Sequence, residues 1–224
     1  VTSFKDNRAS LDLEWQKPWG ALLTSTTGGH VSREKDYQSL GASGTLLAEG
    51  TVAQAIHFNN TLVDLRPGSG ASRVSRSIFA GQGPCACLTT RCCTFPDILI
   101  TDASPLVTNN TFQDAPQAIW ARGVTLGVTT APTLTNNTLT TTDLGIVFQG
   151  SAQGTASGNT IGFKLLGNNG RVGIYVEGDA SPAITGNTVL NDPNRNDTGI
   201  SLNISAASAV QVMNNNICST GSDV

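Results

Sequence analysis

The chain has 224 residues, enough to bury a continuous core; 38% are hydrophobic, 13% charged and 5% aromatic, and the formal net charge is −3. This balance argues against a nucleic-acid partner, because polyanion binding needs clustered Lys and Arg. The content of Val, Ile and Leu argues against disorder, and no apolar run is long enough for a transmembrane helix. We therefore expect a β-rich fold of many short strands and turns.

Residues 1–43 are expected to hold an N-terminal cap and a first coil with a charged loop. The stretch ASLDLEWQKPW (9–19) has the pattern of a short amphipathic helix that stops before Pro18. The most charged run, GGHVSREKDYQSLG (28–41), is typical of an exposed loop. The chain opens with Val1 and shows no basic and apolar leader, which is compatible with an export signal that has been removed.

From residue 44 to 224 the chain repeats one unit, in which a segment of alternating apolar and polar residues precedes an Asn-Thr turn. The unit recurs roughly every 25 residues, which is the signature of a solenoid. A weaker copy, RVSRSIFAG (73–81), places Arg76 at the Asn position within the wide first interval. The aligned Asn residues are Asn60, Asn110, Asn137, Asn159, Asn187 and Asn215.

Each unit predicts three strands: one before a short turn, one that ends at the Asn, and one that begins with the Thr. Asn tolerates the left-handed conformation that the bend between strands needs, and stacked Asn amides hydrogen-bond along a ladder. N-glycosylation is the other interpretation of these turns, because Asn59, Asn109 and Asn136 begin N-x-T sequences, as Asn196 and Asn203 begin N-x-T and N-x-S sequences elsewhere.

An insertion, GPCACLTTRCC (83–93), interrupts the repeat and contains four of the five cysteines. In an oxidising compartment Cys85 and Cys87 would each pair with Cys92 or Cys93. In a reducing compartment the four thiolates would suggest Zn²⁺, but the usual two-residue spacing within each pair is missing. We expect disulfides and neither a metal nor a cofactor. Cys218 lies too many coils away to join them, so it is expected to be a buried free thiol or an intermolecular one.

Alternation along the first strand of each coil predicts which side chains point outward. Glu177 and Arg122 are the candidates for catalysis on this face, but glycoside hydrolysis needs two carboxylates and a Ca²⁺-dependent lyase needs an acidic cluster. Asp102 and Asp179 occupy matching positions in two DASP turns, which favours a role in capping their own backbone. The outward pairs are Leu47/Glu49, Leu99/Thr101, Trp120/Arg122, Val147/Gln149, Tyr175/Glu177 and Ser201/Asn203.

The aromatic residues Trp120 and Tyr175 are expected two coils apart on this face, separated by roughly 10 Å at the strand spacing. Aromatic rings with polar neighbours can hold sugar rings by stacking and hydrogen bonds. The candidate glycan-binding residues are Trp120, Arg122, Gln149, Tyr175, Glu177 and Asn203.

The unit GIYVEGDASPAITGNTVLND (173–192) resembles the parallel β-helix repeat of the pectate-lyase-like superfamily, and the resemblance covers about 44–218. It implies an all-β fold: a right-handed parallel β-helix of about seven coils. It implies little about function, because that fold carries lyases, hydrolases, phage spikes, adhesins and structural surface proteins.

We expect an exported, extracellular or cell-surface protein without catalytic activity. Its role would be that of an adhesive module or a self-assembling structural module, as in a filament. The expected partners are a polysaccharide and a second copy that meets an open C-terminal end. The alternative is a polysaccharide lyase or glycoside hydrolase that uses Glu177 and Arg122.

Overall fold

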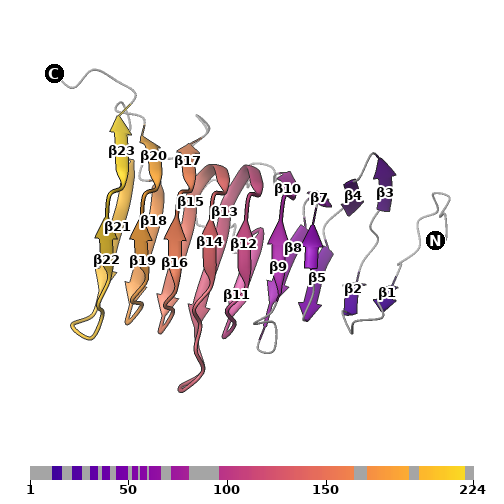
Figure 1. The fold of residues 1–224 in the computed structure, drawn as a ribbon, viewed down its shortest axis with the longest axis horizontal. Helices are drawn as coiled ribbons and strands as arrows, with labels where there is room; N and C mark the ends of the chain where they lie inside the picture. The colour runs from indigo at the N-terminus through magenta and orange to yellow at the C-terminus, as the bar shows by residue number, and fades with distance from the viewer. Residues whose placement is uncertain are drawn as a thin grey trace, which may run out of the picture.

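The computed structural model describes residues 12–16, 22–26, 31–34, 37–40, 44–49, 52–54, 56–59, 61–66, 72–80, 96–163, 171–191 and 197–219. The described secondary structure consists of strands, which stack side by side along an elongated molecule (Figure 1). None of the described residues forms a helix that could cross a membrane. The expected all-β solenoid is confirmed.

Seven coils follow one another within the described residues, and each coil contributes a strand to three faces. The first face contains β5 (Gly44–Glu49), β8 (Thr61–Leu65), β11 (Ile98–Thr101), β13 (Thr111–Gly123), β15 (Thr138–Gly150), β18 (Val172–Gly178) and β21 (Thr198–Ile204). The second face contains β6 (Val52–Gln54), β9 (Arg73–Ser75), β12 (Leu106–Thr108), β14 (Thr133–Thr135), β16 (Thr155–Ser157), β19 (Ala183–Thr185) and β22 (Gln211–Met213).

The third face contains β7 (Ile56–Asn59), β10 (Ile78–Ala80), the first halves of β13 and β15, β17 (Thr160–Phe163), β20 (Thr188–Asn191) and β23 (Asn216–Ser219). β13 and β15 are long because each passes from the third face to the first without a break. All neighbours from β5 to β23 pair in parallel, so residues at equivalent positions in successive coils form columns.

The N-terminal region contains strands where the sequence predicts a helix and a loop. β1 (Asp12–Gln16) pairs antiparallel with β2 (Leu22–Thr26), which pairs antiparallel with β5. The helix expected over 9–19 is therefore wrong. β3 (Val31–Glu34) and β4 (Tyr37–Leu40) form an antiparallel hairpin in the segment expected to be a loop, and β4 extends the third face beside β7. Pairing with an existing sheet edge outweighs the weak local helical pattern.

Apolar columns fill the interior. On the third face the rings of Phe58, Phe79 and Phe112 stack with 4.6 Å between neighbouring centroids. Leu139, Ile161 and Val189 continue this column, and all six side chains are at most 1% exposed. On the first face the interior column contains Ile98, Ile119, Ile146 and Ile174, each 0% exposed.

Two neighbouring residues form the corner between the second and third faces. A single Asn was expected both to adopt the left-handed conformation and to bond along the ladder. The left-handed conformation belongs to the residue before the ladder Asn. The left-handed residues are Arg76, Asn109, Asn136, Gly158, Gly186 and Asn214, with φ between 51° and 63°. The next residue turns its side chain into the stack.

Asn137 shows the bonding of the ladder. Its Oδ1 accepts hydrogen bonds from the backbone N–H and the Nδ2 of Asn110, both at 3.0 Å. Its own N–H and Nδ2 donate to Oδ1 of Asn159, and Nδ2 also donates to the Val107 carbonyl. The same pattern continues through Asn159 and Asn187 to Asn215. Ser77, and not Arg76, precedes Asn110 in the column, and its N–H donates to Asn110 Oδ1.

Asn60, the first expected ladder residue, lies outside the described residues. In the coil of β7 the register pairs His57 with Ile78, so Ile56 is the residue in line with Ser77. The same register places Phe58 beside Phe79 in the interior column, and Leu62 lies half-buried on β8. Phe58 therefore takes the interior place that was expected for Leu62.

The predicted disulfide residues Cys85, Cys87, Cys92 and Cys93 lie outside the described residues. Cys218 is a free thiol on β23 and is half-buried, beside Leu190 of β20. Burial in the interior was expected, but the neighbouring Ile217 takes the interior position in register with Val189.

Candidate functional site

The outward surface of the first face brings the candidate residues together in two columns. Strand pairing aligns Leu99, Trp120, Val147, Tyr175 and Ser201 in one column. A second column contains Thr101, Arg122, Gln149, Glu177 and Asn203. We call this surface, formed by the outward residues of β11, β13, β15, β18 and β21, the first-face surface. Parallel register fixes the order of its side chains along the solenoid axis.

Side-chain hydrogen bonds tie these residues into three pairs. Arg122 Nε donates to Thr101 Oγ1 at 3.0 Å, and Gln149 Nε2 donates to Glu177 Oε2 at 3.0 Å. Asn203 Nδ2 donates to the Tyr175 hydroxyl at 3.3 Å. Each pair joins neighbouring coils, so these polar groups are held in place before any ligand arrives.

The aromatic column is more buried than alternation alone suggests. Val147 points outward between Trp120 and Tyr175, yet it is only 3% exposed, and Leu99 is 8% exposed. Trp120 and Tyr175 are half-buried. The Trp120 indole N–H is buried and has no hydrogen-bond partner among the described residues, so it cannot donate to a ligand at the surface as it stands. A ligand would contact the ring of Trp120.

Next to the first-face surface, on β8, lies a residue that the sequence did not point to. Asp64 on β8 aligns with Leu99, is 3% exposed, and accepts a hydrogen bond from Arg66 at 2.8 Å. It was missed because the repeat around Asn60 was aligned with the wrong corner. Its ion pair with Arg66 makes it a structural carboxylate.

The two Asp residues of the DASP turns each contact the following coil. Asp102 is buried, adopts φ 50°, and accepts hydrogen bonds from the N–H groups of Val124 and Thr125 and from the Thr125 hydroxyl. Burial alone would raise the pKa of Asp102, but these hydrogen bonds together lower it. Asp179 is exposed and accepts a hydrogen bond from the Ser205 hydroxyl. The expected self-capping is replaced by a contact between coils.

The turns after the first face also differ in length. Gly123 pairs with Gly150, and Gly178 follows Glu177, the partner of Gln149. Asp102 follows Thr101, the partner of Arg122, so it occupies the same position in its own coil. Asp102 therefore takes the left-handed position that Gly150 and Gly178 take in later coils. Asp179 comes one residue after this position. The two Asp residues therefore lie at the same distance from the Pro of their turns but at different distances from the preceding strand.

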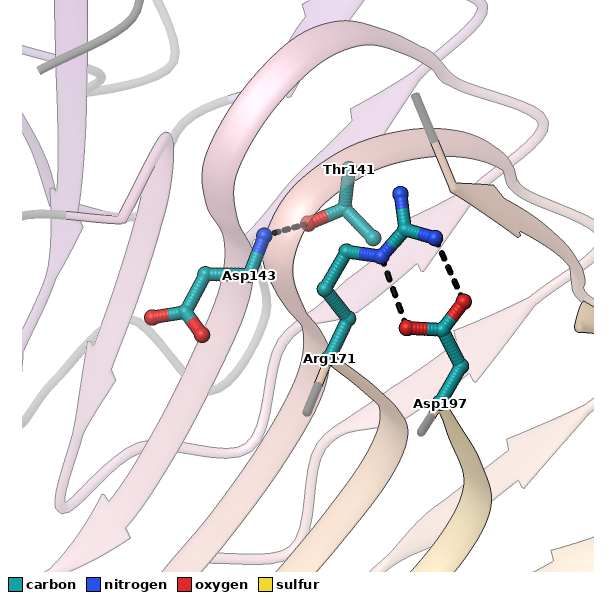
Figure 2. Close-up of polar contacts among 4 residues, drawn as sticks. All are labelled: Thr141, Asp143, Arg171 and Asp197. Carbon is teal, nitrogen blue, oxygen red and sulfur yellow. Dashed lines mark hydrogen bonds and ion pairs between the residues drawn. The ribbon is translucent and has the colours of Figure 1, made fainter. Parts of the chain in front are cut away.

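A second polar group lies where the chain enters the first face (Figure 2). The Arg171 guanidinium contacts both carboxylate oxygens of Asp197, with Nε to Oδ1 at 2.8 Å, and the two side chains are 1% and 0% exposed. The guanidinium also lies 5.0 Å from the ring centroid of Phe163. Asp197 is therefore neutralised by its ion pair.

Asp97 was also missed by the sequence analysis. Register places it in line with Ala118, Gly145, Gly173 and Gly199, which are small because this position faces the crowded corner. It is 2% exposed, and burial raises its pKa to about 8. The one sequence signal for Asp97 is that it is charged, whereas the aligned residues of the later coils are Ala or Gly.

The chemistry available on the first-face surface is limited within the described strands. From β11 to β21 its outward residues include one carboxylate, Glu177, whose Oε2 is already held by Gln149. Among the described residues, no three His, Cys, Asp or Glu side chains lie together so that they could hold a metal ion. The arrangement offers aromatic faces, amides and single charges.

Comparison with known families adds two findings. A family described as the right handed beta helix region matches residues 96–223, which is more than half of the chain. Residues 1–65 match a family described as a protein of unknown function (DUF3570). No curated protein and no solved structure matches the chain.

Proposed function

The chain belongs to the right-handed β-helix family, and from this premise we propose that it is an exported, non-catalytic surface module that binds a glycan on its first-face surface. The observation that supports this function is the pair of half-buried aromatic residues, Trp120 and Tyr175, two strands apart and flanked by polar side chains. Sugars bind to such surfaces through their apolar ring faces and their hydroxyls.

Pre-ordering of the polar groups favours binding. Arg122, Gln149, Glu177 and Asn203 each take part in a hydrogen bond to a neighbouring coil. Because these side chains are already held, a ligand would lose less free energy in ordering them. The rigid parallel stack beneath them keeps their spacing constant along the axis.

The test is binding to an immobilised panel of glycans by the wild type and by Trp120→Ala. We expect at least a tenfold loss of signal for the glycans retained by the wild type, because aromatic residues dominate such interfaces. Leu126→Ala is the matched control, since Leu126 is fully exposed and lies outside the two columns. Thermal unfolding of both variants checks folding, and Tyr175→Ala serves if Trp120→Ala fails to fold. The proposal fails if no glycan is retained, or if the ring variants retain all of them.

A polysaccharide lyase or glycoside hydrolase is the second candidate. The observation in its favour is that Glu177 and the exposed Asp179 lie two residues apart at the end of β18, since hydrolysis needs two nearby carboxylates. Release of reducing ends or unsaturated products from polysaccharides by the wild type, abolished in Glu177→Gln, would establish this activity. Absence of both products favours the binding module.

Self-association is a further part of the proposal. In the last described coil Leu202, Val212 and Ile217 are 46%, 43% and 49% exposed. The strands of this coil have described neighbours on one side only, and such an edge beside exposed apolar residues is a template for another chain. Sedimentation with and without reductant, using the wild type and Cys218→Ser, separates covalent from non-covalent assembly. A monomer under all conditions contradicts self-association.

A further inference from the structure

Charges are distributed unevenly along the first-face surface. Arg122 lies at the β13 end, and Glu177 lies at the β18 end, with Gln149 between them in register. The two charges are therefore two strand spacings apart, roughly 10 Å. Asp179, in the turn that follows β18, adds a second carboxylate at the same end.

Each of these charged groups keeps part of its hydrogen-bonding capacity. The only described partner of the Arg122 guanidinium is the Thr101 hydroxyl, which contacts Nε, so its terminal nitrogens remain available. Gln149 contacts Oε2 of Glu177, and Ser205 contacts Oδ1 of Asp179. The second oxygen of each carboxylate has no partner among the described residues. Glu177 is half-buried and Asp179 is exposed, so a ligand can reach both.

No described cation neutralises the acidic end. Arg171 directly precedes β18, but it is buried and bound to Asp197. Arg66 is bound to Asp64 on β8. The outward residues of β18 and β21 are Tyr175, Glu177, Ser201 and Asn203, none of them basic.

We infer that the glycan of the proposed function contains an amino sugar, whose ammonium group binds between Glu177 and Asp179 while an oxygen acceptor of the same chain binds Arg122. This inference rests on the proposed function. Tyr175 lies on the same strand as Glu177 and supplies a ring for the aminated sugar, as Trp120 does beside Arg122. The surface disfavours polyuronates, because a carboxylate at every sugar would meet the two carboxylates at the β18 end.

The experiment is calorimetric titration with short oligomers of glucosamine, glucose and galacturonate. We expect the glucosamine oligomer to bind most tightly and to weaken as salt is added, because exposed ion pairs are screened. Glu177→Gln and Asp179→Asn should each weaken glucosamine binding roughly two- to fivefold, and this loss should be larger than the effect of the same variant on glucose binding. Asp114→Asn is the matched control: it removes the same charge from the β13 bulge, where Asn also tolerates the left-handed φ of 59°.

The outcomes separate the two proposals. Tighter binding of galacturonate than of glucosamine, or equal binding of glucose and glucosamine with no effect of the acidic variants, overturns the amino-sugar inference and leaves glycan binding intact. Failure of all three oligomers and of the glycan panel to bind overturns the proposed function itself. Folding of each variant is checked by its unfolding temperature, so a loss of binding is not mistaken for a loss of structure.

Discussion

At the scale of single residues, Asp97 stands out as an acid in a corner built for small side chains. In line with it, Gly173 has so little space that an added Cβ would lie 2.6 Å from the Gly199 carbonyl oxygen and 2.7 Å from Val189. Asp97 occupies the equivalent position in its own coil at 2% exposure, and one of its carboxyl oxygens has no hydrogen-bond partner among the described residues. A neutral carboxyl group suits this position better than a charged one.

The raised pKa of Asp97 makes stability depend on pH. The folded protein keeps this proton up to about pH 8, whereas the unfolded chain releases it near 3.8. The stabilising effect of the proton is therefore complete below about pH 4 and is lost as pH rises through 8, at up to about 1.4 kcal/mol per pH unit. Urea unfolding at several pH values should show this decline in the wild type. Asp97→Asn should flatten it, and an unchanged slope in that variant would refute the assignment.

Asn137 is the residue on which the ladder argument can be tested. Asn137→Ala leaves the Asn110 amide and the Val107 carbonyl without their buried partners, so the free energy of unfolding should fall by about 3 kcal/mol or more. Asn215→Ala should cost less, because Asn215 is only half-buried and donates to no further ladder Asn among the described residues, although it accepts two bonds from Asn187 and donates to the Ile184 carbonyl. Equal losses in the two variants, measured by urea unfolding, would contradict the ladder as the source of stability.

At the scale of strands and turns, the Arg171–Asp197 pair joins the beginnings of β18 and β21 (Figure 2). Both side chains are almost fully buried, so removal of one partner leaves an uncompensated charge. We expect Arg171→Met to lower the free energy of unfolding by about 3–5 kcal/mol. Adding Asp197→Leu should restore much of that loss, because a buried ion pair and an apolar pair are often equivalent. A double variant as unstable as Arg171→Met would contradict this expectation, because an apolar pair would then not replace the ion pair.

The same scale shows what the sequence could and could not predict. The columns from Leu99 to Ser201 follow from period-2 alternation, because β11, β13, β15, β18 and β21 pair without a shift at those positions. Asn60 misled the alignment because the NNT pattern also occurs in the sequence between β7 and β8, whereas the corner of the coil formed by β8, β9 and β10 reads Arg76–Ser77. The Arg171–Asp197 contact could not be predicted in this way. It depends on the path of the segments that precede β18 and β21, and these segments do not follow the alternating pattern of the strands.

At the scale of the whole molecule, the solenoid is a one-dimensional stack in which each coil contacts only its neighbours (Figure 1). In the coils of β13 and β15 the core residues Phe112, Ile119, Leu139 and Phe148 are at most 1% exposed, whereas in the last described coil Leu202 and Ile217 are 46% and 49% exposed. Local stability should therefore vary along the axis. The glycan surface lies over the coils from β11 to β21 and spans this gradient.

Hydrogen exchange can measure that gradient. Amides of β13 and β15 are paired on both sides and cover a buried core, so they should open only with much of the stack. Amides of β21 and β23 have described neighbours on one side only, and beneath them Leu202 and Ile217 are nearly half exposed. We expect exchange in β21 and β23 to be faster by roughly 100-fold or more. Because an ammonium ligand at Glu177 and Asp179 would bind next to β21, a saturating glucosamine oligomer should slow exchange in β18 and β21 more than in β13. Uniform exchange along the stack would mean that the coils unfold as one unit, and stability would then be shared by the whole molecule.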